Sequence, residues 1–172
     1  MSSMHLLYEV LRPLTSQSEC QTCKLCEENI GLVYLLDKET EAISKRNVPL
    51  SITSRGAQYI GRTSQGCCAA FNSTGNSCTI YESRPLCCRL YPLDLITKNG
   101  EIWWVIHVEC PIAKRFLSER KLAVLAAMTV AIEKNLENEV LQNWLINDRM
   151  SQNIEAFSST RPRTIILRRL GL

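Results

Sequence analysis

The order of apolar and polar residues predicts short elements in the first part of the chain. Residues 4–11 have a helical pattern that ends before Pro13, because proline cannot continue a helix. Residues 31–36 form an apolar run that is typical of a buried strand. Asp37 is placed to cap a helix that extends to Arg46, and further acidic residues lie near the positive end of that helix.

The second half of the chain predicts a hairpin followed by one long helix. Residues 93–97 and 102–108 are apolar runs, and the Asn99-Gly100 pair between them is a strong hairpin signal. From residue 113 to about 147, apolar residues recur at steps of three and four, as one face of a helix requires. These positions are Leu122, Leu125, Met128 or Thr129, Ile132, Leu136, Val140 and Trp144.

Together these elements predict an α+β fold in a single domain of residues 1–172. A loop-rich cysteine core with short strands and a hairpin is expected over residues 20–111. The helix of residues 113–148 is expected to back this core with apolar side chains. Residues 151–172 are expected to form a basic tail that is solvated and partly disordered.

Composition adds one unusual feature, nine cysteines among 172 residues, all of them between Cys20 and Cys110. The rest is ordinary for a folded domain: 45% of residues are hydrophobic, 22% are charged and the formal net charge is +3. These values exclude an intrinsically disordered chain, which combines low hydrophobicity with high net charge.

The longest apolar run, residues 122–132, is too short to span a bilayer. The first 19 residues lack a signal-peptide pattern, so we expect a cytoplasmic protein.

Three roles are open to the cysteines: disulfides, buried thiols or metal ligands. Cytoplasmic thiols stay reduced, and an odd number of cysteines cannot pair completely within one chain. Lone cysteines often act as small buried apolar residues, but that role does not account for two-residue gaps and adjacent pairs. The spacing therefore favours metal ligation.

The first cysteine group, Cys20-x2-Cys23-x2-Cys26, has the spacing that opens the bacterial ferredoxin run. In that run a remote cysteine is followed by proline, and here Cys110-Pro111 supplies such a pair. Zinc sites also use two-residue gaps, usually as two separate pairs that complete a tetrahedron. The first group therefore favours a cubane iron–sulfur cluster and leaves zinc open.

The second cysteine group contains two adjacent pairs and one single cysteine. Neighbouring side chains of an extended segment point to opposite sides, so one cysteine of each pair can face a metal while the other packs or serves a second site. Arg84 and Arg89 lie among these cysteines, where positive charge offsets the charge of clustered thiolates, and we predict both as cofactor-binding residues. The alternative for both arginines is an ordinary surface position. The group comprises Cys67, Cys68, Cys78, Cys87 and Cys88.

The segment CCAAFNSTGNSCTIYESRPLCCRLYP resembles the signature of the YkgJ-type cysteine-cluster family. Members of that family are described as zinc- or iron-chelating and are often labelled iron–sulfur oxidoreductases. Cys68 with Phe71 matches the first element of the signature. With the N-terminal group and Cys110-Pro111, the resemblance covers roughly residues 20–111. The remaining matches are Cys78, Ile80, Tyr81, Arg84, Pro85, Cys88, Arg89, Tyr91 and Pro92.

The resemblance implies that seven cysteines are metal ligands and that Cys67 and Cys87 are extras. The first group departs from the family pattern, because Glu27 follows Cys26 where a second cysteine is common. Seven cysteines fit one four-ligand site with spares, or two partly separate sites. The implied ligands are Cys20, Cys23, Cys26, Cys68, Cys78, Cys88 and Cys110.

Three functions are consistent with such a cysteine set. The leading hypothesis is a 4Fe–4S protein that transfers electrons or assists a redox or modification enzyme. The second is a structural zinc module in which every ligand is cysteine. The third is a metal-dependent enzyme with an open coordination position beside polar groups such as His107 or Glu109. The sequence predicts no catalytic residue.

We expect a protein partner, no membrane contact and no nucleic acid. Four thiolates around one zinc or one oxidised 4Fe–4S core bring a charge of about −2, which takes the formal +3 to about +1. The mild basic balance is therefore better explained by compensation of a metal centre than by nucleic-acid binding. The apolar residues 165–167, between the arginines of the tail, leave open a docking segment for a partner.

Overall fold

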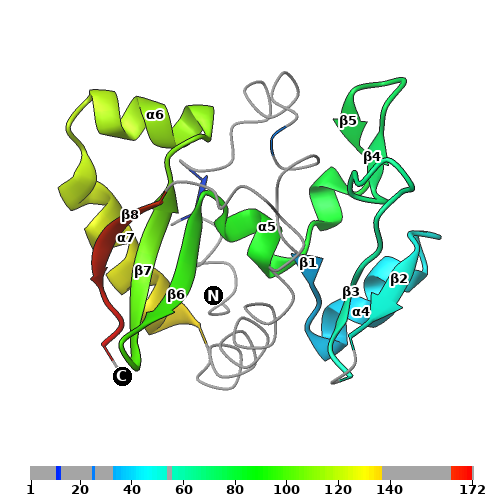
Figure 1. Cartoon of the computed structure of the whole chain (residues 1–172), viewed down its shortest axis with the longest axis horizontal. Helices are drawn as coiled ribbons and strands as arrows, with labels where there is room; N and C mark the ends of the chain where they lie inside the picture. Colours follow the sequence, from blue (N-terminus) through cyan, green and yellow to red (C-terminus); the bar gives the residue numbers. More distant parts are fainter. Residues whose placement is uncertain (1–10, 13–24, 26–32, 54–55, 137–163, 172) are drawn as a thin grey trace.

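Figure 1 shows a computed structural model of the chain, which describes residues 11–12, 25, 33–53, 56–136 and 164–171. The helix expected over residues 4–11 lies outside this part except for Leu11, which is helical. The continuation of the C-terminal helix past residue 136 also lies outside the described residues.

A three-stranded antiparallel sheet of β6, β7 and β8 forms one half of the protein (Figure 1). Strands β6 (Leu93–Lys98) and β7 (Glu101–His107) form a hairpin. The turn residues Asn99 and Gly100 have φ values of 53° and 78°, in the left-handed region that a tight two-residue turn requires. The hairpin prediction is confirmed.

Helices α6 (Pro111–Ser118) and α7 (Leu122–Asn135) pack against one face of this sheet. They are separated at Arg120, whose left-handed φ of 54° cannot continue a right-handed helix. The charged run 119–121 has no apolar side chain to bury, so packing does not oppose the break. The helix expected over residues 113–148 is therefore two helices within the described residues, and both back the sheet as expected. No helix in the described ranges has the length and apolar character needed to cross a membrane.

Strand β8 (Thr164–Arg169) pairs with β7 and completes the sheet. Residues 164–169 are therefore an ordered strand rather than a disordered tail, although Thr164, Ile165, Ile166 and Arg169 remain exposed, as a solvated tail predicts. The guanidinium of Arg168 contacts the carboxylate of Glu133 on α7, and the same carboxylate accepts a hydrogen bond from Trp104 Nε1 at 2.6 Å. This mostly buried carboxylate is paired with a counter-ion from β8, so the basic segment is tied to α7 as well as to β7.

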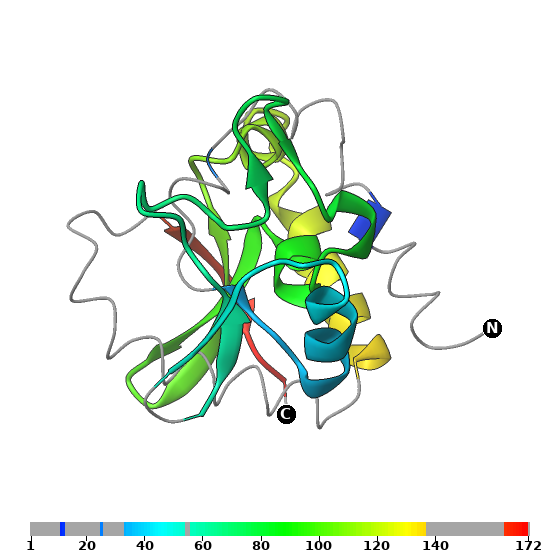
Figure 2. The same ribbon diagram turned by 90° about the vertical axis from the view of Figure 1, so that its right-hand side faces the viewer.

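The other half of the protein, which faces the viewer in Figure 2, is built from short elements. Strands β1, β3 and β2 form an antiparallel sheet in that order, and β4 and β5 form a separate hairpin. Strand β1 lies within the apolar run predicted as a strand. The elements are β1 (Val33–Tyr34), α4 (Asp37–Ser44), β2 (Leu50–Ile52), β3 (Gln58–Ile60), β4 (Phe71–Asn72), β5 (Ser77–Cys78), the 3-10 helix η2 (Tyr81–Ser83) and α5 (Leu86–Leu90).

Helix α4 lies where a helix was expected, but its start is capped differently. Asp37 is the first helical residue and Leu36 is the N-cap. The backbone N–H of Leu36 donates to Glu39 Oε2 at 3.0 Å, as the second half of a capping box does. The N-cap position therefore needs no polar side chain of its own. The helix ends at Ser44, earlier than the pattern predicts.

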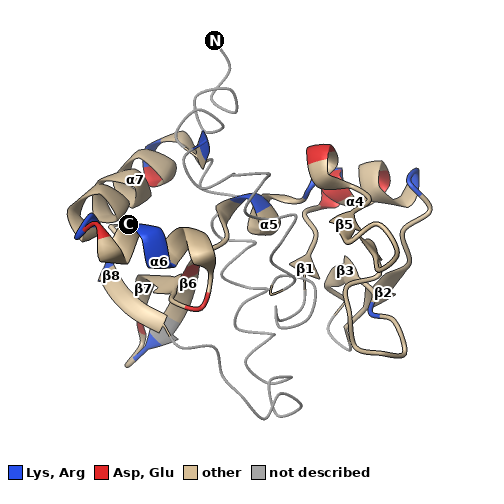
Figure 3. Cartoon of the chain, turned by 90° about the horizontal axis from the view of Figure 1, so that it is seen from above, with Lys and Arg blue, Asp and Glu red and all other residues tan. Residues whose placement is uncertain are grey.

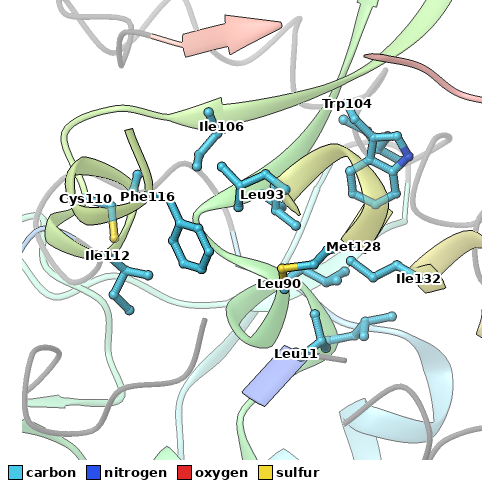
Figure 4. Close-up of a cluster of buried hydrophobic side chains, with 14 of the residues drawn as sticks. Leu11, Leu90, Leu93, Trp104, Ile106, Cys110, Ile112, Phe116, Met128 and Ile132 are labelled. Atoms are coloured by element: carbon cyan, nitrogen blue, oxygen red, sulfur yellow. The ribbon is translucent and has the colours of Figure 1, made fainter. Parts of the chain in front are cut away.

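Two hydrophobic clusters fill the two halves, and α5 lies between them (Figure 1). The first, the sheet core, packs side chains of β6, β7, α6 and α7 around the fully buried Trp104 (Figure 4). Leu86 and Leu90 of α5 belong to this core, whereas Cys87 and Cys88 of the same helix pack against the second cluster. That second cluster, the cysteine-lobe core, comprises Val33, Leu35, Ile43, Val48, Ile60, Ala70 and Ile80.

We expect the variant Arg168→Ala to destabilise the protein through Glu133. The Glu133 side chain is 11% exposed, so removal of its counter-ion leaves a nearly buried charge, which costs about 3 kcal/mol in free energy of unfolding. Arg169→Ala is the matched control, because the Arg169 side chain is 63% exposed and pairs with Glu101 at the surface. That surface pair should contribute less than about 1 kcal/mol. Urea unfolding measures both values, and equal losses would contradict the role of Arg168.

Candidate metal centre

A tight turn presents the first adjacent cysteine pair. Arg62 and Cys68 form an antiparallel bridge, and the Thr63 N–H donates to the Cys67 carbonyl at 2.8 Å within the loop between them. Gly66, just before the pair, has a φ of 82°, a left-handed conformation that favours glycine. Cys68 packs against the cysteine-lobe core, while Cys67 stays in the turn.

The β4–β5 hairpin places Cys78 beside this turn. Phe71 pairs with Cys78 across the hairpin, and the Phe71 N–H donates to the Cys68 carbonyl at 3.0 Å. Asn72 Oδ1 accepts two backbone N–H groups of the hairpin loop at 3.0 and 3.1 Å, which fixes the loop. Cys68 and Cys78 are therefore linked through Phe71, and both pack against the cysteine-lobe core.

Cys88, which also packs against the cysteine-lobe core, lies on α5. Pro85 precedes the helix and offers no side-chain hydrogen bond to it. The first helical N–H, that of Leu86, instead donates to Glu39 Oε1 at 2.7 Å. A carboxylate on α4 thus satisfies the start of the helix that carries Cys88.

The thiols of Cys68 and Cys88 both lie within electrostatic reach of the Cys78 thiol. Burial raises the pKa of the Cys78 thiol to about 11, and the like charges of Cys88 and Cys68 add to the increase. The Ile80 N–H and the Arg84 guanidinium lower this pKa without outweighing burial. Without a cation, Cys78 is therefore a neutral thiol at pH 7. A bound metal supplies the positive charge that converts such thiols to thiolates.

Cys87 has a contact of its own, because its thiol donates a hydrogen bond to the Tyr34 carbonyl of β1 at 3.3 Å. Its pKa is raised well above the usual range, first by its hydrogen bond with Cys88 and then by burial. The exclusion of Cys87 from the ligand set stays a prediction.

The two arginines predicted to bind the cofactor take different positions. The Arg84 guanidinium lies 3.6 Å from the centroid of the Tyr81 ring, and its charge lowers the pKa of Cys78. Arg89 donates hydrogen bonds to the carbonyls of Arg84 and Glu82 at 2.7 and 2.6 Å. Arg84 therefore places positive charge near the thiols, whereas Arg89 organises the backbone around them.

Cys110 lies in the sheet core rather than against the cysteine-lobe core. It is 5% exposed and packs near Ile112 and Phe116, with Pro111 of α6 directly after it (Figure 4). It is also the N-cap of α6, so its position is fixed by the start of that helix. The described residues thus hold the matched cysteines in two places.

The polar groups considered for an open coordination site have contacts of their own. His107 Nε2 lies 3.0 Å from Asp94 Oδ2, and His107 Nδ1 is buried without a hydrogen-bond partner among the described residues. The Asp94 carboxylate also raises the pKa of Cys87, so this pair lies close to α5. Glu109 is partly exposed and lies 3.8 Å from Lys114 Nζ. His107 is therefore oriented by Asp94, and Glu109 by a surface contact.

The predicted ligands Cys20, Cys23 and Cys26 lie outside the described residues. Within the described part, no three His, Cys, Asp or Glu side chains are grouped so that they could hold a metal ion by themselves. No disulfide forms among the six cysteines that the structure describes. Their donor chemistry, reduced sulfur on a partly buried surface, suits zinc or iron, and the assignment of Cys68, Cys78 and Cys88 as ligands stays a prediction.

Sequence reasoning did not identify Glu39 or Tyr34 as parts of this region. The contribution of Tyr34 is a backbone carbonyl, which every residue possesses and which no pattern distinguishes. Glu39 has the position of a capping-box carboxylate near a helix start, and that signal predicts a bond within its own helix. Its second bond, to a residue far along the chain, depends on tertiary structure.

A family model described as "CxxCxxCC: Putative zinc- or iron-chelating domain" matches residues 19–111. The match contains all nine cysteines and covers more than half of the 172 residues. No curated protein and no solved structure matches the chain. The match supports binding of zinc or iron and does not choose between them.

Alkylation of the metal-free protein tests the environment of Cys78. Because its pKa is raised from 9.0 to about 11, its reaction rate with iodoacetamide should keep rising up to about pH 11. In urea, the reaction rate of the same cysteine should level off near pH 9 instead. Peptide mass spectrometry measures both profiles, and identical profiles would contradict the buried environment. Since ligation needs thiolates, metal binding at pH 7 should also release protons.

Proposed function

Since this chain belongs to the YkgJ-type family of zinc- or iron-chelating cysteine-cluster proteins, we propose that its cysteines bind a 4Fe–4S cluster. The observation that carries the proposal is that Cys68, Cys78 and Cys88 come from a turn, a hairpin and a helix and all pack against the cysteine-lobe core. The charges of Cys68 and Cys88 both act on Cys78, although the three thiols do not by themselves form a metal site. A cubane cluster takes four thiolates, so at least one further cysteine completes the set.

The spacing of the remaining cysteines supports iron over zinc. Cys20, Cys23 and Cys26 have the two-residue gaps of a ferredoxin run, and Cys110-Pro111 has the Cys-Pro pair of its remote ligand. A structural zinc site would more commonly draw its four ligands from two separate pairs. We propose that one cysteine of the N-terminal group supplies the fourth thiolate of the cluster, and that the other matched cysteines are spares or belong to a second, partly separate site.

The surroundings of the grouped thiols support an anionic centre. An oxidised 4Fe–4S core with four thiolates carries a charge of about −2. The charge of Arg84 acts on Cys78 and reduces the repulsion among the sulfurs. The partial burial of the three cysteines limits the access of water, which influences the reduction potential of such a cluster.

We propose electron transfer as the function, either as an independent carrier or as an accessory to a redox or modification enzyme. When cysteine occupies every iron there is no open position for a substrate, and the cluster supplies one-electron chemistry. The partner is then a protein that exchanges electrons with it. The proposed location is the cytoplasm, where thiols stay reduced.

Anaerobic purification tests the identity of the metal. We expect a brown protein with about four irons and about four acid-labile sulfides per chain, whose visible absorption bleaches on reduction. A colourless protein with stoichiometric zinc would overturn the cluster and favour the structural zinc module. Iron without labile sulfide would overturn the cluster as well.

Two serine variants test the ligand assignment. Cys88→Ser should lose at least half of the bound iron, because it removes a sulfur donor from the grouped thiols. Cys67→Ser should retain nearly all of it, since Cys67 is predicted to be an extra cysteine outside the ligand set. Iron and sulfide analysis of both variants measures the difference, and equal losses would contradict the assignment.

A further inference from the structure

One carboxylate joins the two helices of the cysteine lobe. Glu39 Oε2 accepts the N–H of Leu36, the N-cap of α4, at 3.0 Å. Glu39 Oε1 accepts the N–H of Leu86, the first residue of α5, at 2.7 Å. Each oxygen therefore satisfies the start of a different helix. Figure 3 shows the acidic residues of α4 in red and the arginine of α5, Arg89, in blue.

The burial of this carboxylate is costly and therefore needs an explanation. Burial raises the pKa of Glu39, although the bonds from Leu36 and Leu86 and the charge of Arg89 act against the increase. Without Glu39, the N–H of Leu86 would lose its acceptor at a residue that is only 6% exposed. Pro85 cannot replace it, because a proline N-cap has no side-chain acceptor.

The bond to Leu86 acts directly on the cysteines that follow. The next residue, Cys87, donates its thiol hydrogen to the Tyr34 carbonyl. Two successive residues of α5 are therefore held by the β1–α4 segment, one through its N–H and one through its thiol. Successive side chains of a helix differ in direction by about 100°, so fixing these two residues fixes the direction of Cys88.

We propose that Glu39 is a positioning residue for the metal centre. Its carboxylate holds the first turn of α5 so that Cys88 stays against the cysteine-lobe core, where Cys68 and Cys78 also pack, in the position that ligation requires. Glu39 itself contacts no metal and acts through the Leu86 N–H. This inference rests on the proposed function insofar as Cys88 is a ligand, but it holds for iron and zinc alike.

The test compares Glu39→Gln with Glu41→Gln, a change of the same kind on the same helix. A glutamine at position 39 replaces one of the two acceptor oxygens by an NH2 donor, so one of the two N–H groups loses its acceptor. The Glu41 side chain is 76% exposed and pairs only with Lys45 at the surface, so its variant controls for the lost charge. Glu39→Asp is a second variant, which keeps the charge and shortens the reach.

Co2+ is the probe, added to the reduced, metal-free full-length protein in competition with a chelator. Loss of a residue that orients a ligand typically weakens metal affinity 10–100-fold, so we expect a loss of about 10-fold or more for Glu39→Gln and Glu39→Asp. The cobalt–thiolate absorption spectrum should change in both variants. Glu41→Gln should match the wild type in affinity and spectrum.

Alkylation of the metal-free protein gives a readout that needs no metal. We expect Cys87 to react several-fold faster in Glu39→Gln, because the loosened turn frees its thiol from the Tyr34 carbonyl. Cys67, in its separate turn, should react at the wild-type rate. Circular dichroism and urea unfolding establish that each variant is folded.

The outcomes separate the two proposals. If the Glu39 variants bind Co2+ with wild-type affinity and spectrum, Glu39 has only a structural role and the inference is overturned, whatever the change in stability. If the wild type binds Co2+ but the anaerobically purified protein contains zinc, the 4Fe–4S proposal fails. The positioning role of Glu39 is then decided by the Co2+ affinity of its variants alone. Wild-type protein that binds neither Co2+ nor iron overturns both.

Discussion

Helix α5 is five residues long, yet it contributes side chains to both hydrophobic clusters. Leu86 and Leu90 are one helical turn apart and enter the sheet core. Of the three residues between them, Cys87 and Cys88 pack against the cysteine-lobe core, and Arg89 donates hydrogen bonds to the carbonyls of Glu82 and Arg84. Turning the thiols into the sheet core would require a rotation of about 100° or more and would remove the leucines from it. The hydrophobic packing of α5 therefore sets the direction of its cysteines, and Glu39 and Tyr34 hold that direction from the other side.

The second constraint is electrostatic. Gathering thiols on a partly buried surface disfavours their charged form, which is the reason the pKa of Cys78 rises. Arg84 and the Ile80 N–H only partly offset this cost. The protein is therefore organised so that a cation of the centre, rather than its own side chains, balances the sulfurs. Cys87 needs no counter-ion, because its thiol stays neutral and donates a hydrogen bond to the Tyr34 carbonyl.

The fold could be predicted where short-range rules govern it. The Asn99-Gly100 pair determines its hairpin because both residues accept a left-handed backbone. The interruption at Arg120 and the pairing of β8 could not be predicted, because each depends on partners elsewhere in the chain. Arg168 contacts Glu133, a mostly buried carboxylate that also accepts a bond from Trp104, and neither is near it in sequence. Pairing with β7 and the packing of Leu167 and Leu170 against the sheet core hold the same segment.

The sequence by itself determined the cysteine set, its spacing and the family to which the chain belongs. These follow from local chemistry, because sulfur donors and two-residue gaps carry their meaning without tertiary context. Only the tertiary structure decided that Cys68, Cys78 and Cys88 share one core while Cys110 packs in another. It also gave Glu39 its second bond, across 47 residues of chain. Both outcomes depend on which apolar faces pack together, and that is a property of the whole chain rather than of any segment.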